Sequence, residues 1–186
     1  RIFYLCPKCG SEFAMKTVKT RIYCEKCGNS ATLNAFYELA AESEESVIPA
    51  SIGDWYELQR QHEFSRICRD PQIKMSGHVV LRQPRFGREP FSAVGEGMVT
   101  LSQNGLCYDG SRDGANFKLE VPLGVLKAIL YGAECDFEIY YQGQFYYFEP
   151  ERLLECVKWS IFGEQLYEYH ILRKRDVNGT VGAKRD

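Results

Sequence analysis

The sequence contains no run of eighteen apolar residues, which excludes a helix of the kind that crosses a bilayer. It also shows no signal-peptide pattern at its start. The first residue is Arg1 rather than Met, so we expect the chain to be a piece or a trimmed form of a longer protein.

Groups that carry out catalysis are scarce. The three histidines, His62, His78 and His170, do not stand at a spacing from Ser, Cys or Asp that indicates a known chemistry. The glycine-containing stretch "GEGM" at 95–98 has no predicted helix after it, so it is typical of a β-bulge and not of a phosphate-binding loop. These residues therefore supply no catalytic constellation.

Neither sign of charge is in large excess, because the formal net charge is only −2. Residues 1–34 carry six Lys or Arg against Glu12 and Glu25, so the first segment is basic and the rest of the chain is acidic. A dedicated nucleic-acid-binding protein is usually basic across a whole face. The charge pattern therefore argues against that class for the chain as a whole.

Cysteine is plentiful, and its distribution is uneven. Four of the eight cysteines form two Cys-x2-Cys pairs, whereas a secreted disulfide framework spreads its cysteines through a small loop-rich chain. We therefore expect a reducing compartment, one metal site and four buried thiols that act as small apolar side chains. Those four are Cys68, Cys107, Cys135 and Cys156.

The two pairs, "CPKC" and "CEKC", have the spacing of a zinc ribbon. Zn2+ prefers four soft ligands at the corners of a tetrahedron, and two residues between cysteines let one turn aim both sulfurs at the same ion. Gly10 and Gly28 follow the pairs and allow the backbone to fold back. Residues 11–23 are expected to form a hairpin between the pairs. The predicted zinc ligands are Cys6, Cys9, Cys24 and Cys27.

Other interpretations of the four cysteines stay open. A redox Cys-x2-Cys normally occurs as one pair on a βαβ background, and two disulfides are a further alternative. An iron ion with the same four thiolates is also compatible with the spacing. With zinc, four thiolates leave no open coordination position, so the predicted role of the ion is structural.

The remainder of the chain is predicted to be mainly β, within an α+β class. Residues 51–69 form an expected helix with Ser51 as its N-cap, and a second helix is expected at 150–172. Between them the expected strands are 73–83, 91–103, 106–110, 116–122, 135–142 and 144–150, and 123–132 is ambiguous. The predicted domains are a zinc ribbon at 1–37, an acidic linker at 38–50, a β domain with helices at 51–172 and a tail at 173–186.

The order of strands and terminal helix resembles the pleckstrin-homology/GRAM fold. The segments that carry the resemblance are "LSQNGLCYDG", "FKLEVPLGVLKAI" and "DFEIYYQGQFYYFEP". The resemblance implies a curved antiparallel barrel, with flanking helices, over residues 73–172. Such closure removes exposed strand edges.

Three consecutive segments carry a second resemblance: "FYLCPKCGSEFAMKTVKTRIYCEKCG", the acidic segment and "IPASIGDWYELQRQ". Together they resemble the C-terminal extension of bacterial phospholipid/glycerol (lysophosphatidate-type) acyltransferases. That family's catalytic motif is His-x4-Asp, and this chain lacks it: Ile67, Gln83 and Arg175 stand five residues after the three histidines. The resemblance implies a non-catalytic regulatory or membrane-positioning region on the cytoplasmic membrane face, with the active site upstream in the same polypeptide.

The resemblance also suggests where such a region would meet lipid. Pleckstrin-type folds often present their first strand–strand loop to a phosphate-rich surface, which here is the segment of Arg82, Arg85, Phe86 and Arg88. Arginine forks match phosphate oxygens, and each basic residue near an anionic surface contributes about 1 kcal/mol. The alternative is a solvated hairpin with Phe86 tucked beneath it.

Two rival functions come from other classes. The basic ribbon could contact nucleic acid through Lys16, Lys19 and Arg21. The chain could instead be a protein-interaction adaptor that uses the aromatic run Phe145–Phe148, although strand alternation buries half of such a run.

Overall fold

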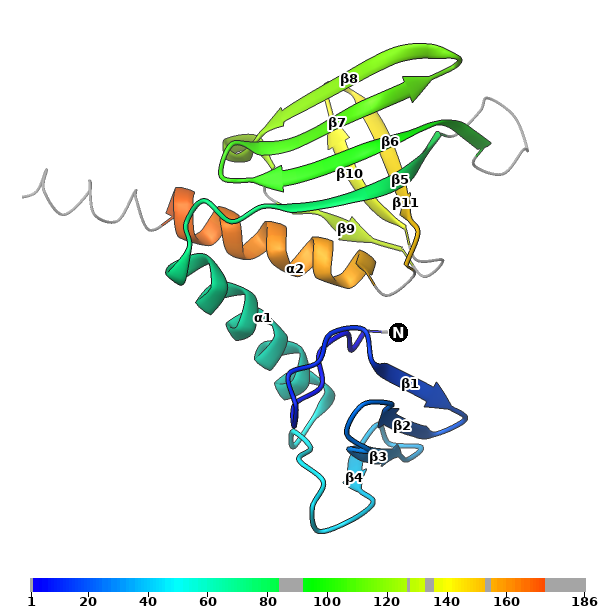
Figure 1. Cartoon of the computed structure of the whole chain (residues 1–186), viewed down its shortest axis with the longest axis vertical. Helices are drawn as coiled ribbons and strands as arrows, with labels where there is room; N and C mark the ends of the chain where they lie inside the picture. Colours follow the sequence, from blue (N-terminus) through cyan, green and yellow to red (C-terminus); the bar gives the residue numbers. More distant parts are fainter. Residues whose placement is uncertain (1, 84–91, 127, 133–135, 153–154, 173–186) are drawn as a thin grey trace, which may run out of the picture. The chain divides into compact units, whose positions relative to one another are not determined.

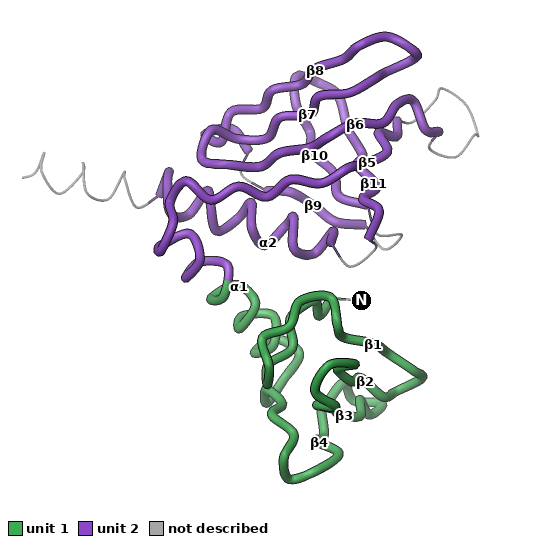
Figure 2. Tube along the Cα trace, in the orientation of Figure 1, with its two compact units in different colours: residues 1–62 green, residues 63–186 purple. Residues whose placement is uncertain are grey.

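The computed structural model describes residues 2–83, 92–126, 128–132, 136–152 and 155–172 (Figure 1). The chain folds as two compact units, Arg1–His62 and Glu63–Asp186 (Figure 2). The described residues confirm a mainly β protein with two antiparallel sheets and two α-helices. The boundary between the units falls within the first helix, α1 (Ile52–Arg69).

The first unit contains a four-stranded antiparallel meander. Its strands follow one another in chain order and are β1 (Met15–Val18), β2 (Arg21–Cys24), β3 (Ser30–Leu33) and β4 (Leu39–Ala41). The pair β1–β2 is the hairpin that the sequence predicts between the two cysteine pairs. The segment 38–50, predicted as an acidic linker, contains β4, which pairs with β3.

Helix α1 begins where the sequence predicts. Ser51 Oγ accepts the backbone N–H of Asp54 at 3.0 Å and donates to the Asp54 carboxylate at 2.8 Å. This reciprocal cap satisfies an amide that has no partner within the helix. The predicted helix 51–69 is confirmed as Ile52–Arg69.

The first part of α1 is joined to the N-terminal segment of its own unit. The rings of Phe3 and Trp55 stack with centroids 4.2 Å apart, and Trp55 Nε1 donates to the Leu5 carbonyl at 3.0 Å. Gln59, which is fully buried, accepts the backbone N–H groups of Tyr4 and Leu5 at 2.8 and 3.2 Å. These contacts fix the first cysteine-containing loop to the helix.

The second unit is a seven-stranded antiparallel sheet with the order β8-β7-β6-β5-β11-β10-β9. The strands are β5 (Met75–Gln83), β6 (Ser92–Ser102), β7 (Gly105–Arg112), β8 (Ala115–Pro122), β9 (Leu130–Tyr131), β10 (Phe137–Tyr141) and β11 (Gln144–Pro150). A short 3-10 helix, η1 (Leu123–Val125), follows β8. The last two elements that the structure describes are α2 (Glu155–Tyr167) and a π-helical turn, η2 (Glu168–Leu172).

The expected closed barrel is not formed among the described residues. The two outermost strands of the sheet, β8 and β9, each pair with one neighbour only. Helix α2 contacts β9, β10, β11 and η1, and Figure 1 shows it lying alongside β9. Its side chains Trp159, Phe162 and Leu166 join the core of the sheet. The helix therefore buries the apolar face that sheet closure would otherwise cover.

Three other expectations need correction. The third strand does not end at Asp109–Gly110, because β7 continues to Arg112 and the chain turns at Asp113–Gly114, where both φ angles are positive. Pro150 ends β11 and does not open the last helix.

Cys68 is exposed and Cys107 is half-buried, whereas Cys156 is buried as expected. Cys135 lies outside the described residues.

The bulge expected near the glycines of the second strand is confirmed. The β5–β6 register shifts between Leu81, which pairs with Gly95, and Arg82, which pairs with Ala93. Val94 is therefore the extra residue of a bulge.

Candidate metal centre

The fold brings the four predicted metal ligands together. The Sγ atoms of Cys6, Cys9, Cys24 and Cys27 all lie within 4.8 Å of one another. The first pair stands in the loop before β1, whereas Cys24 ends β2 and Cys27 lies in the loop that leads to β3. The group could hold a metal ion, and its four donors come from both ends of the hairpin.

The two cysteine loops have the same backbone hydrogen bonds. The N–H groups of Gly10 and Gly28 donate to the carbonyls of Cys6 and Cys24 at 2.9 and 3.0 Å. Both glycines have positive φ, +67° and +71°, a conformation in which glycine carries no steric penalty. Each loop therefore reverses in the same way and presents its two sulfurs to one side.

The residue after each of these glycines forms a second backbone hydrogen bond across its loop. Cys6 N–H donates to the Ser11 carbonyl at 3.0 Å, and Cys24 N–H donates to the Asn29 carbonyl at 2.8 Å. Neither Ser11 nor Asn29 is among the predicted site residues. A usable signal exists, because both stand directly after the glycine that follows a cysteine pair.

The sulfur spacings match a shared ion. Cys6 Sγ lies 3.6 Å from Cys27 Sγ, and Cys9 Sγ lies 3.8 Å from Cys24 Sγ. In a tetrahedron with metal–sulfur bonds of about 2.3 Å, neighbouring sulfurs are about 3.8 Å apart. A disulfide needs about 2.05 Å. All four cysteines are free thiols in this structure.

The pKa values of Cys6, Cys9 and Cys27 are shifted in different directions. Burial raises the pKa of Cys6 to about 12, against the opposing effect of the backbone amides of Cys9 and Lys8. Hydrogen bonds between Cys9 and the side chain and backbone of Ser11 lower the pKa of Cys9 to about 6. Burial also raises the pKa of Cys27, which the Asn29 amide partly offsets. In each of these three thiols, backbone hydrogen bonds favour the thiolate form and burial opposes it.

Asn29 connects the cysteine cluster to the segment after β4 by hydrogen bonds. Its side chain is buried; Oδ1 accepts the Val47 N–H at 2.8 Å, and Nδ2 donates to the Val47 carbonyl at 2.9 Å. Nδ2 also lies 3.9 Å from Cys6 Sγ. This residue therefore links the second cysteine loop, the first cysteine and the segment after β4. Such outer hydrogen bonds orient the ligands of metal sites.

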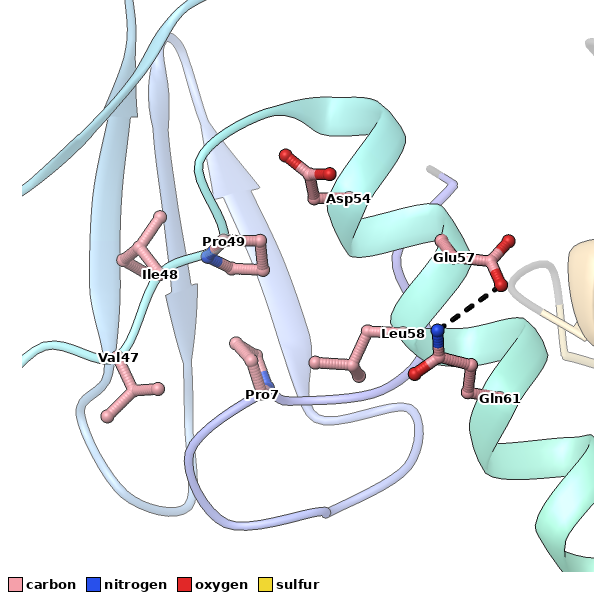
Figure 3. A pocket seen from close by; sticks show the side chains of 8 residues that line it. All are labelled: Pro7, Val47, Ile48, Pro49, Asp54, Glu57, Leu58 and Gln61. Atoms are coloured by element: carbon pink, nitrogen blue, oxygen red, sulfur yellow. Dashed lines mark hydrogen bonds between the residues drawn. The ribbon is translucent and has the colours of Figure 1, made fainter.

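A shallow pocket of about 380 Å³ adjoins the first cysteine loop within the same unit (Figure 3). Pro7 and the Val47–Pro49 segment form one side, and the first turns of α1 form the other. Leu58 adds to the apolar wall, while Asp54 and Glu57 supply acidic groups. The lining of the pocket therefore combines apolar side chains with two carboxylates.

Two basic residues of the first unit are paired with carboxylates. Arg21 Nε lies 2.7 Å from the Glu42 carboxylate, and Lys16 Nζ lies 3.7 Å from Glu25. Lys19 is exposed at the β1–β2 turn. Two of the three cations expected to contact nucleic acid therefore have carboxylate partners.

The predicted lipid-contact residues divide into two groups. Arg82 lies in β5, where its guanidinium forms an ion pair with the Glu149 carboxylate of the neighbouring strand β11. Arg85, Phe86 and Arg88 lie outside the described residues. The one described arginine of this set is thus engaged by a carboxylate.

The three histidines have separate partners. His62 Nε2 lies 3.6 Å from the Glu12 carboxylate, and His78 Nδ1 lies 3.5 Å from that of Glu151. His170 Nε2 lies 3.0 Å from the carbonyl oxygen of Pro71.

In the part of the chain that the structure describes, no helix is both long and apolar enough to cross a membrane. Comparisons with models of protein families, with curated proteins and with solved structures find no match to this chain.

Proposed function

We propose that this chain is a zinc-stabilised, non-catalytic accessory module that regulates or positions a lipid-modifying enzyme. The observation that carries the metal part is the cluster of four cysteine sulfurs within 4.8 Å. Four thiolates with spacings near 3.6–3.8 Å suit Zn2+, which forms closed tetrahedral sites with such ligands.

The role of the ion is structural. Zinc with four cysteine ligands has no position left for water or substrate. The first unit has a small apolar core around Phe3 and Trp55, with Met15 and Ile22 from the hairpin. A unit of this size gains much of its folding free energy from metal binding.

The proposal that the partner enzyme modifies lipids comes from the resemblance to the C-terminal extension of phospholipid/glycerol acyltransferases. Support comes from the order of modules: a cysteine-rich ribbon, a capped helix and a curved antiparallel sheet packed against a terminal helix. In this proposal the second unit is a pleckstrin-homology/GRAM-like domain in which α2 takes the place of barrel closure. The active site lies upstream in the parent polypeptide.

A direct test of membrane positioning is co-sedimentation with vesicles of anionic or neutral phospholipid at low and physiological salt. The proposal predicts binding to anionic vesicles alone, lost in the Arg85→Ala/Arg88→Ala variant. Absence of binding at both salt concentrations would remove the membrane role. The upstream sequence of the parent gene tests the enzyme context, because a His-x4-Asp motif there is required.

A protein-interaction role is a second candidate, and exposed aromatic side chains on the second unit favour it. Phe145 is 45% exposed and Tyr140 is 63% exposed. The nucleic-acid role has weaker support, because Lys16 and Arg21 are paired with carboxylates. It would require binding that falls steeply with added salt and depends on Lys16, Lys19 and Arg21.

A further inference from the structure

The hairpin of β10 and β11 has two faces of different character. Ile139 and Phe148 point into the core of the second unit. Alternation sends Tyr140, Phe145 and Tyr147 to the opposite face, which we call the aromatic face. Tyr140 and Phe145 are exposed, and Tyr147 is half-buried.

The three rings of the aromatic face form one continuous surface. Tyr140 and Phe145 pair across the strands, with ring centroids 4.8 Å apart. Phe145 and Tyr147 follow on the same strand at 6.1 Å, with ring planes only 27° apart. Contiguous exposed apolar surface on a folded domain marks an interaction site more often than scattered single residues do. Tyr and Phe are also enriched in the cores of such sites.

Two carboxylates, Glu138 and Glu149, lie on the same strands as the aromatic face. Residues 130–151 contain five acidic residues and no Lys or Arg. Glu138 is the cross-strand partner of Tyr147 and accepts a side-chain hydrogen bond from it, and Glu149 stands two residues further along β11. Arg82 of the neighbouring strand β5 stands opposite Tyr147 and pairs with Glu149. This charge repels a phosphate-rich surface and attracts a cation.

We propose that the aromatic face binds a basic, arginine-containing segment of a partner protein. A guanidinium group can lie flat on Phe145 or Tyr140 and can at the same time meet the carboxylates of Glu138 or Glu149. Charge complementarity selects this occupant over a lipid surface or a nucleic acid, because both of those are anionic. The inference rests on the second unit alone and does not require the metal centre or the acyltransferase resemblance.

The test is fluorescence anisotropy of the full chain with a labelled peptide of alternating Arg and Gly. Peptides with Lys or Glu in place of Arg serve as comparisons. Because guanidinium stacks on aromatic rings better than ammonium does, the Arg peptide should bind about fivefold tighter than the Lys peptide. The Glu peptide should not bind. The Tyr140→Ala/Phe145→Ala variant should weaken Arg-peptide binding about tenfold.

Two further variants make the test decisive. Phe36→Ala removes an equally large ring that is 83% exposed on the first unit, and it should leave binding unchanged. Arg82→Gln removes the competing cation from Glu149 and should strengthen binding about twofold to threefold. A role of Arg82 in contacting anionic lipid predicts no such gain.

Several outcomes would overturn the proposal. The first is that the Arg and Lys peptides bind with equal affinity and that the Tyr140→Ala/Phe145→Ala variant binds both as well as the unchanged chain does, because this would indicate unspecific charge attraction. The second is that Phe36→Ala loses as much binding as the double variant. Binding of anionic vesicles that depends on Tyr140 and Phe145 would show that the occupant is a membrane.

Discussion

Cys6 and Cys27 stand 21 positions apart in the sequence, yet their Sγ atoms lie 3.6 Å apart. This distance is far longer than a disulfide bond and close to the sulfur spacing in a tetrahedral metal–thiolate site. The contact joins the start of the first unit to the loop between β2 and β3. A metal ion shared by these two loops would hold the hairpin against the N-terminal segment.

Replacing one ligand should therefore unfold the first unit. Cys24→Ser removes one of four thiolates and leaves a buried hydroxyl in its place. We expect the variant to lose bound metal and the slow hydrogen exchange of β1–β3, while the amides of β5–β7 keep their protection. Hydrogen exchange with mass spectrometry measures both units in one sample.

The matched control is Cys68→Ser, because Cys68 is an exposed thiol on α1 outside the cluster. It should keep the metal and the exchange pattern of the unchanged chain. If Cys24→Ser also retains metal and protection, the cysteine cluster does not stabilise the first unit.

The buried amide of Gln59 gives a second prediction. Gln59→Leu leaves the N–H groups of Tyr4 and Leu5 and the Ile2 carbonyl without their side-chain partner. Each buried group without a hydrogen bond costs about 1–3 kcal/mol, so we expect a loss of about 3 kcal/mol in the unfolding free energy of the first unit. Denaturant-dependent exchange measures this loss. Gln61→Leu, at an exposed position of the same helix, should change stability by less than about 0.5 kcal/mol. Equal effects of the two variants would refute this role.

Close contact between β6 and β7 gives a third prediction. A Cβ added at Gly97 would lie 2.5 Å from the Asp109 carbonyl oxygen and 2.6 Å from Gly110 Cα. Both are backbone atoms, so the strands must separate. We expect Gly97→Ala to cost about 2–3 kcal/mol in a urea unfolding experiment on the second unit. Gly124→Ala, which meets nothing within 4 Å, should be close to neutral, and a comparable loss there would contradict the argument.

Glu155 at the start of α2 gives a prediction about pH. Burial raises the pKa of its carboxyl group, and the nearby charges of Arg152 and Lys158 oppose this in part. The folded state therefore holds this proton more tightly than the unfolded chain. Its contribution to stability is full below the ordinary value of 4.5 and is lost as pH rises through the folded pKa.

Glu155→Gln should accordingly stabilise the second unit at neutral pH and reduce the decline in stability between pH 4.5 and neutrality. Thermal unfolding across this range measures the effect. Glu164→Gln, on the same helix, provides the comparison. A Glu155→Gln variant that is less stable than the unchanged chain at neutral pH would show that the ion pair with Arg152 outweighs the burial.

Local signals in the sequence were sufficient for much of the fold. The Ser51 cap and the bulge near Gly95 depend on a few neighbouring residues, and the structure has them where expected. The four cysteines also come together as their spacing predicts. Tight turns and paired ligands restrict the backbone so strongly that distant contacts do not change them.

The misplaced elements depend on contacts that are distant in sequence. Asp109–Gly110 has the composition of a turn, but Gly110 lies opposite Gly97 in the sheet, where neighbouring backbone leaves no room for a Cβ. The open sheet was likewise not predictable locally, because it depends on how α2 packs against β9, β10 and β11. Burial of Gln59 and exposure of Tyr140 also follow only from the assembled units.

The measurement that tests the central claim most directly is zinc K-edge X-ray absorption, combined with metal analysis, on chain purified without added metal. The account predicts a single zinc ion per chain with four sulfur neighbours at about 2.3 Å. Three results would contradict this prediction: iron in place of zinc, oxygen or nitrogen atoms among the neighbours of the ion, or cysteines that form disulfides and hold no metal.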